Sequence, residues 1–205
     1  MKRLWILLVI LVLVATPAMA KKKAVEEPEK KDDAPMSAAT FSGLKMRNIG
    51  PSINSGRVSD FAVQPDAHHI IYAATASGNL WKTVNAGTTW EPIFDKEKSY
   101  SIGCVTLDPN NPNVVWVGTG ENNSQRSVAF GDGVYKSLDG GQNWENVGLE
   151  ESEHIGMITI DPNDPDVVYV ASQGPLWRSG GERGVYKTTD GGATWERVQI
   201  GRAHV

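Results

Sequence analysis

Charged and amide side chains gather in two irregular stretches of the sequence, residues 121–132 and 173–183. Together they hold carboxylates, guanidinium groups and one indole, which are groups that orient and stack on a bound ligand. The candidate ligand-binding residues are Glu121, Asn122, Asn123, Arg126, Asp132, Trp177, Arg178, Glu182 and Arg183. The same composition would also arise from ion pairs that stiffen the loops, and both interpretations stay open.

Carboxylates can also take part in catalysis, and hydrolysis of a glycosidic bond is one reaction that uses a pair of them. Most glycoside hydrolases place two carboxylates on either side of the scissile bond, and Glu121, Asp132 and Glu182 are the candidate acids. The sequence contains no Ser-His-Asp arrangement, phosphate-binding loop or zinc-protease motif. The catalytic residues therefore stay unassigned.

The remaining composition excludes several other classes of function. His68 and His69 lack a third ligand at metal spacing, so we expect neither a metal site nor a cofactor. A formal net charge of −4 gives no indication of nucleic-acid binding. Cys104 is the only cysteine and lies in an apolar run, which predicts a buried thiol and no internal disulfide. Arg57 and His154, at the starts of repeated strands, are expected either to face a central channel or to cap strand ends.

The N-terminal region predicts export. Lys2 and Arg3 precede an apolar run at residues 4–15, and an Ala-x-Ala pattern ends at Ala20, which together predict a signal peptide over residues 1–20. The run is too short to span a bilayer, so we expect cleavage after Ala20 and no membrane insertion. The expected location is the periplasm, the cell surface or the extracellular space.

Two further segments are expected to lie outside the folded part. Residues 21–40 mix five lysines with five acids and contain few large apolar side chains, so they predict a disordered charged linker. Residues 200–205 continue no earlier pattern, and we interpret them as a non-native tail on a natural chain that continues further. The folded part is then residues 41–199.

A threefold repeat organises that folded part, over about residues 56–95, 101–148 and 154–198. Trp90, Trp144 and Trp195 recur at intervals of 54 and 51 residues, a length typical of one propeller blade. Short runs of β-branched and aromatic residues predict strands, and helical spacing is absent beyond residue 20. The prediction is an all-β fold: a partial β-propeller of three four-stranded blades, with strands at 101–107, 113–119, 133–138 and 142–147 in the second repeat. The third repeat predicts strands at 154–160, 167–172, 184–189 and 193–198, and Asp-Pro turns at 108–112 and 161–165.

Each repeat contains a Ser/Thr-x-Asp-x-Gly-x-Thr-Trp turn, at residues 137–144 and 188–195 and, in a degenerate form, at 83–90. The Asp or Asn side chain is expected to accept hydrogen bonds from amides of its own turn. The glycines supply positive φ, and the Trp is expected to pack inside its blade. We assign structural roles to Asn85, Gly87, Trp90, Asp139, Gly141, Trp144, Asp190, Gly192 and Trp195.

These turns are Asp-boxes, and the region from Phe41 to Val198 resembles bacterial Asp-box (BNR repeat) β-propeller proteins. Segments 48–51, 118–123 and 131–136 are especially similar to the group that is assigned to the sortilin N-terminal domain superfamily and often labelled "glycosyl hydrolase". The same repeat occurs in sialidases and xyloglucan-cleaving propellers, so the resemblance implies the fold more than the reaction. In the xyloglucan-cleaving enzymes a Thr-Asp-x-Gly-Gly acid follows the second strand of the first blade. The matching residue here is Ala76.

We therefore expect an exported propeller that binds a protein, peptide or glycan ligand through the loops between second and third strands. The alternative is a glycoside hydrolase whose acids are Glu121, Asp132 or Glu182, or lie in further blades of the same full-length chain. The first hypothesis places the site on the face opposite the Asp-boxes.

Overall fold

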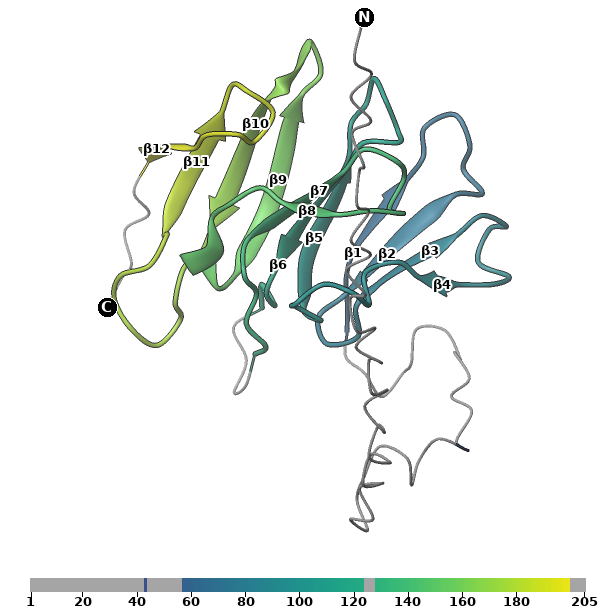
Figure 1. Cartoon of the computed structure of the whole chain (residues 1–205), viewed down its shortest axis with the longest axis horizontal. Helices are drawn as coiled ribbons and strands as arrows, with labels where there is room; N and C mark the ends of the chain where they lie inside the picture. The colour runs from purple at the N-terminus through teal and green to yellow at the C-terminus, as the bar shows by residue number, and fades with distance from the viewer. Residues whose placement is uncertain (1–42, 44–56, 124–127, 200–205) are drawn as a thin grey trace, which may run out of the picture. The chain divides into compact units, whose positions relative to one another are not determined.

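The structure is a computed structural model that describes Gly43, residues 57–123 and residues 128–199 (Figure 1). The chain divides into two units, Met1–Met46 and Arg47–Val205. Only Gly43 is described in the first unit, and every element below belongs to the second. The predicted signal peptide, charged linker and tail lie outside the described residues, so this division of the chain stays a prediction.

Three four-stranded antiparallel sheets make up the described fold, each following chain order (Figure 1). Sheet 1 contains β1 (Val58–Val63), β2 (Ile71–Thr75), β3 (Leu80–Thr83) and β4 (Glu91–Pro92). Sheet 2 contains β5 (Ile102–Leu107), β6 (Val115–Thr119), β7 (Val134–Ser137) and β8 (Glu145–Asn146). Sheet 3 contains β9 (Ile155–Asp161), β10 (Asp164–Ser172), β11 (Gly184–Thr188) and β12 (Glu196–Gln199). The prediction of an all-β partial propeller is confirmed.

Helical structure is minimal in the part of the chain that the structure describes. The one regular helix there is η2, a 3-10 turn at Glu150–Ser152 between sheets 2 and 3. Among the same residues, no helix has the length and apolar character needed to cross a bilayer.

Several strand limits differ from the prediction, and the fourth strand of sheet 3 begins at Glu196 instead of residue 193. The fourth strand of sheet 2 is only Glu145–Asn146, because the residues before Trp144 form the preceding turn. In sheet 3 the strand β10 already begins at Asp164, which pairs with Asp161 inside the predicted Asp-Pro turn. The register then shifts between Asp164 and Val168, so Pro165 lies in an irregular part of the ladder where its missing N–H is tolerated.

The Ser/Thr-x-Asp/Asn turns share one hydrogen-bond pattern. They lie at residues 83–90, 137–144 and 188–195, and we call them the blade turns. Asp139 Oδ1 accepts the amide of Asn143 at 2.9 Å, and the Gly141 amide donates to Ser137 Oγ at 2.8 Å. Thr188 and Asp190 repeat both bonds. Asn85 also accepts the amide four residues later, at 2.9 Å. The degenerate first turn therefore keeps the geometry through a neutral acceptor.

Two apolar clusters join the sheets. The first contains Tyr72, Leu80, Phe94, Val105 and Val117, and lies between sheets 1 and 2. The second lies between sheets 2 and 3 and contains Trp116, Cys104, Ile155, Ile158 and Val168. Cys104 is buried, as the sequence predicted, and burial raises the pKa of its thiol to about 12.

Two of the three blade-turn tryptophans, Trp144 and Trp195, pack between sheets, whereas the sequence analysis placed them inside their own blade. Trp144 Nε1 donates to the Ile93 carbonyl at 2.7 Å, and its ring meets Phe94 edge-on at 5.1 Å. Trp195 contacts Trp116 of the preceding sheet in the same edge-on way. The indole N–H finds its acceptor only across the interface, and that requirement moves the ring out of its own sheet.

Candidate functional site

The candidate loops leave the strand ends opposite the blade turns. Segment 120–133 connects β6 to β7, and segment 173–183 connects β10 to β11, whereas the blade turns follow the other end of β7 and β11. Both loops contact the link between sheets 2 and 3. The Gly131 amide donates to the Glu153 carbonyl at 2.7 Å, and the Glu182 amide donates to the Glu151 carbonyl at 3.2 Å. The two loops therefore share one face through residues 149–156.

Glu121 is the most buried of the candidate acids. It is 4% exposed and forms an ion pair with Arg57, whose side chain is half exposed at the start of β1. Its backbone amide donates to the Ala129 carbonyl at 3.0 Å. The pair ties the loop of sheet 2 to sheet 1, so the carboxylate already has a charged partner.

Asn122 connects the inner strands of two sheets. Its side-chain Nδ2 donates to the Gly103 carbonyl at 3.0 Å and lies 3.5 Å from the Gly156 carbonyl oxygen. Its backbone carbonyl accepts a hydrogen bond from the Gln173 side chain. Asn123 is exposed beside it, and Arg126 lies outside the described residues.

Asp132 belongs to a hydrogen-bond network inside sheet 2. Its Oδ2 accepts the Tyr135 hydroxyl at 2.7 Å, and its amide donates to Thr119 Oγ1 at 2.8 Å. Its carbonyl accepts Asn146 Nδ2 at 2.9 Å. Burial raises the pKa of Tyr135 to about 12, so the phenol keeps its proton and remains a donor to this carboxylate.

In the second loop, the charged side chains have partners and the indole is exposed. Arg178 pairs with Glu153, Arg183 donates to the Pro175 carbonyl, and Glu182 Oε2 accepts the Glu151 amide at 2.9 Å. Trp177 is 61% exposed. Its ring is therefore available for stacking on a ligand.

Residues outside the predicted set complete this face. Phe130 is 59% exposed, and its ring lies 5.6 Å from the His154 imidazole. His154 is fully buried, and neither of its ring nitrogens has a hydrogen-bond partner within the described ranges. Burial lowers the pKa of His154, and the Glu153 carboxylate opposes that shift. The sequence pointed to Arg57 and His154 as strand starts, but it carried no signal for Glu153 as the partner of Arg178.

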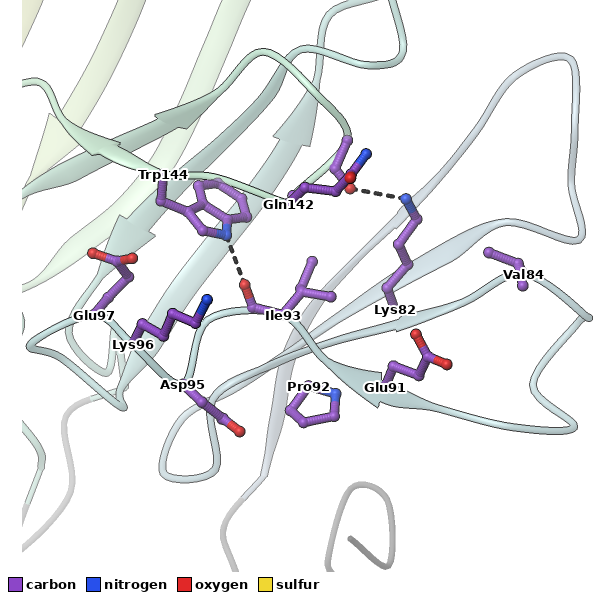
Figure 2. Close-up of a pocket in the computed structure, with 12 residues that line it drawn as sticks. Lys82, Val84, Glu91, Pro92, Ile93, Asp95, Lys96, Glu97, Gln142 and Trp144 are labelled. Atoms are coloured by element: carbon purple, nitrogen blue, oxygen red, sulfur yellow. Dashed lines mark hydrogen bonds between the residues drawn. The ribbon is translucent and has the colours of Figure 1, made fainter.

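A groove recurs at the equivalent place in each of the two sheet interfaces. Figure 2 shows a groove of about 560 Å³ between sheets 1 and 2, where Lys82 Nζ donates to the Gly140 carbonyl at 2.8 Å and Trp144 reaches Ile93. A groove of about 480 Å³ repeats it between sheets 2 and 3, with Lys136 and Gly191 in the equivalent places. Because the groove recurs, it is a product of sheet stacking rather than a specialised site.

A third hollow lies against the first strands of the three sheets. It measures about 330 Å³ and is lined by Asp60, Thr106, Asn122 and Thr159, among others. Asp60 Oδ2 accepts the Val105 amide at 3.0 Å. This hollow adjoins the candidate loops through Asn122. Within residues 57–123 and 128–199, no group of three or more His, Cys, Asp and Glu side chains is placed to hold a metal ion.

Known proteins with similar sequences are xyloglucanases. No protein-family model matches the chain. Xyloglucanase Xgh74A of Acetivibrio thermocellus is 27% identical over 175 residues, which are 79% of this chain and 20% of that protein. A xyloglucanase of Paenibacillus sp is 24% identical, over 79% of this chain and 16% of its own length. The chain thus spans about a fifth of the length of these curated relatives.

Solved structures that resemble the fold include GH74 enzymes. An ancestral GH74 enzyme superposes with a TM-score of 0.57 at 23% identity, covering 73% of this chain and 19% of its own. The GH74 enzyme of Niastella koreensis gives 0.52 at 24% identity, covering 71% of this chain and 21% of its own. These similarities establish the propeller fold, and the narrower sortilin assignment stays a prediction.

Proposed function

We propose that this chain is part of an exported xyloglucanase-like β-propeller and that its ligand is a glycan. The observation that carries the proposal is the 27% identity to a xyloglucanase over 175 residues. The loops at 121–132 and 173–183 are the proposed glycan-contacting segments. In them Trp177 offers an exposed ring to a sugar face, and Asn123 offers an exposed amide.

The hydrolytic acids of such a protein are proposed to lie beyond the described residues. Ala76 stands where the resemblance expects an acid, and it is 1% exposed with its carbonyl accepting Ser101 Oγ at 2.6 Å. Glu121 is committed to Arg57, and Asp132 to Tyr135. Glycoside hydrolysis uses one acid that protonates the leaving group and a second that activates water or attacks the sugar. A carboxylate that already holds a charged or hydroxyl partner in the fold is less available for either role.

The same contacts favour a second candidate function, which is glycan recognition without cleavage. Here the three sheets and their loops bind the polysaccharide, and hydrolysis does not occur on this chain. The two functions differ in whether bound glycan is turned over.

Binding and turnover on xyloglucan separate these functions. We expect the chain to be retarded in affinity electrophoresis through gels that contain xyloglucan. Trp177→Ala should weaken this binding about tenfold, or about 1.4 kcal/mol, while Leu138→Ala in a blade turn should leave it unchanged.

Retardation without release of reducing ends would favour recognition. Release of reducing ends that Glu121→Gln abolishes in a folded variant would place a hydrolytic acid in this chain. A chain that neither binds nor cleaves xyloglucan or a wider glycan panel would refute the proposal.

Export belongs to the same proposal and has its own test. Residues 1–20 have the charged, apolar and Ala-x-Ala pattern of a leader. N-terminal sequencing of the exported protein should begin at Lys21. A product that retains Met1 would contradict cleavage.

A further inference from the structure

One residue of the link between sheets 2 and 3 contacts both candidate loops. The backbone carbonyl of Glu153 accepts the Gly131 amide at 2.7 Å, and its carboxylate forms an ion pair with Arg178. Gly131 lies between β6 and β7, in what we call the first loop, and Arg178 lies between β10 and β11, in the second loop. The backbone of Glu153 thus holds one loop, and its side chain holds the other.

Both contacts lie next to an exposed aromatic ring. Phe130 precedes Gly131 in the chain, and Trp177 precedes Arg178. The two aromatic residues are 59% and 61% exposed. A ring that is oriented before the ligand arrives binds more tightly, because less conformational freedom is lost on binding. Glu153 is therefore placed to orient an aromatic ring of each loop.

The tip of the second loop is tied to the protein by this ion pair. Residues 177–180 are all exposed. Arg178 is the one residue of these four that has a hydrogen bond or ion pair to the rest of the described chain. Its side chain is 62% exposed, whereas that of Glu153 is 19% exposed. The less exposed carboxylate is thus the anchor, and the guanidinium brings Trp177 with it.

The base of the second loop has contacts of its own. Arg183 donates to the Pro175 carbonyl, and Glu182 Oε2 accepts the Glu151 amide at 2.9 Å. Neither bond involves the carboxylate of Glu153. Removal of that carboxylate therefore releases the tip and leaves the base in place.

The backbone of Glu153 is strained in a way that suits this double contact. Its φ of 54° and ψ of −40° lie outside the main allowed regions of L-residues. Such strain persists where the surroundings require it, and it clusters at ligand-binding sites. Here the Glu153 carbonyl is packed against the start of the first loop so closely that a Cβ on Gly120 would lie 1.9 Å from its oxygen.

We propose that Glu153 is a positioning residue for glycan binding, which orients Trp177 through Arg178 and Phe130 through Gly131. This inference rests on the proposed function, because it takes the ligand to be a glycan. The ion pair to Arg178 is partly exposed, so its contribution falls as salt screens it. Xyloglucan carries no charge, so salt should weaken its binding through the ion pair of the protein.

Titration calorimetry with xyloglucan oligosaccharides tests the carboxylate. Glu153→Gln should weaken binding about threefold, as loss of a partly exposed ion pair would. Glu151→Gln removes the same charge from an exposed neighbour and should bind like the wild type. Between about 0.01 M and about 1 M salt, the wild-type affinity should fall to that of Glu153→Gln, whose own affinity should stay constant. Unchanged binding by Glu153→Gln overturns the proposal.

A double-mutant cycle tests whether Glu153 acts through the indole. Trp177→Ala already removes the ring, so adding Glu153→Gln to it should cause no further loss of affinity. Losses that simply add would show that the carboxylate acts elsewhere and would overturn the proposal. Arg178→Met removes the ion pair from its more exposed partner and should reproduce the effect of Glu153→Gln.

Fluorine NMR of fluorotryptophan-labelled protein reads the ring without any ligand. The Trp177 signal is assigned by its loss in Trp177→Phe, and in Glu153→Gln it should narrow and move towards the shift of free fluorotryptophan. The signal of Trp144, which packs between sheets 1 and 2, is the internal control and should not move. A Trp177 signal that stays unchanged in Glu153→Gln overturns the proposal. A signal that moves in a chain that binds no glycan supports the role of Glu153 and refutes the proposed function instead.

Discussion

The indole Nε1 of Trp195 donates a hydrogen bond of 2.7 Å to the carbonyl of Val147, a residue 48 positions earlier in the chain. Trp144 forms the same bond to Ile93, 51 positions earlier. The second and third repeats therefore attach their blade turns to the end of the preceding repeat. The bond couples two sheets, so a change at the tryptophan acts on the stacking of the blades.

Replacing Trp195 by alanine should destabilise the protein by about 3 kcal/mol, the low end for loss of a large aromatic because the indole is only partly buried. The change removes the contact with Trp116 and leaves the Val147 carbonyl without its donor. Urea unfolding followed by circular dichroism measures the effect. Trp177→Ala is the control, since this ring is 61% exposed, and it should cost less than about 0.5 kcal/mol. Equal losses for the two variants would contradict the proposed role of Trp195.

Arg57→Ala should cost about 1–2 kcal/mol, because it leaves the buried Glu121 carboxylate without its charged partner. The value is lower than for a fully buried pair because the arginine side chain is 48% exposed. A double-mutant cycle with Glu121→Gln should give a coupling free energy of about 1 kcal/mol. Arg178→Ala is the matched control, since its pair with Glu153 is more exposed, and it should cost little. Zero coupling between Arg57 and Glu121 would show that the pair contributes nothing to the fold.

Stability should fall as the pH drops below about 6.5, and His154 should account for that loss. Burial lowers the pKa of His154 in the folded protein below its ordinary value of 6.5. Above pH 6.5 both states hold a neutral ring, and below it the unfolded state takes up a proton first and is favoured. The free energy of unfolding should therefore decrease between pH 7.5 and 5.5 in the wild type.

The His154→Phe variant should lose this dependence, while His68→Phe, at an exposed position, should retain it. Urea titrations at the two pH values give the comparison. A slope that persists in His154→Phe would assign the proton uptake to another group.

Asp139 should govern a separate loss of stability in acid. Hydrogen bonds from Asn143 and from neighbouring groups of the turn lower the pKa of Asp139 from 3.8 to about 2. A lowered folded pKa gives stability that is present above pH 4 and is lost as the pH falls towards 2. Asp139→Asn should fold at neutral pH, because Asn85 occupies the same position in the first blade turn, and should show a smaller loss in acid. The reverse change, Asn85→Asp, should increase the acid sensitivity, and no change in either variant would contradict this explanation.

The fold class was readable from the sequence because its signals are local and repeat three times. Val114 and Val167 begin apolar runs of strand length, and the blade turns mark where each third strand ends. Hydrogen bonds within a turn, such as Asn143 to Asp139, join residues four apart. Such contacts follow from residue type and spacing alone, so the turn motif predicted them.

The partners across sheets were decided only by the tertiary structure. The bonds from Trp195 to Val147 and from Arg57 to Glu121 join residues 48 and 64 positions apart. Loop composition marked Glu121 and Asp132 as ligand groups or ion pairs without choosing between them. Their choice of Arg57 and Tyr135 depends on how neighbouring strands align and which sheets stack. A carboxylate in a loop has the same chemistry in either role, and only the groups that folding brings within hydrogen-bond distance determine which role it takes.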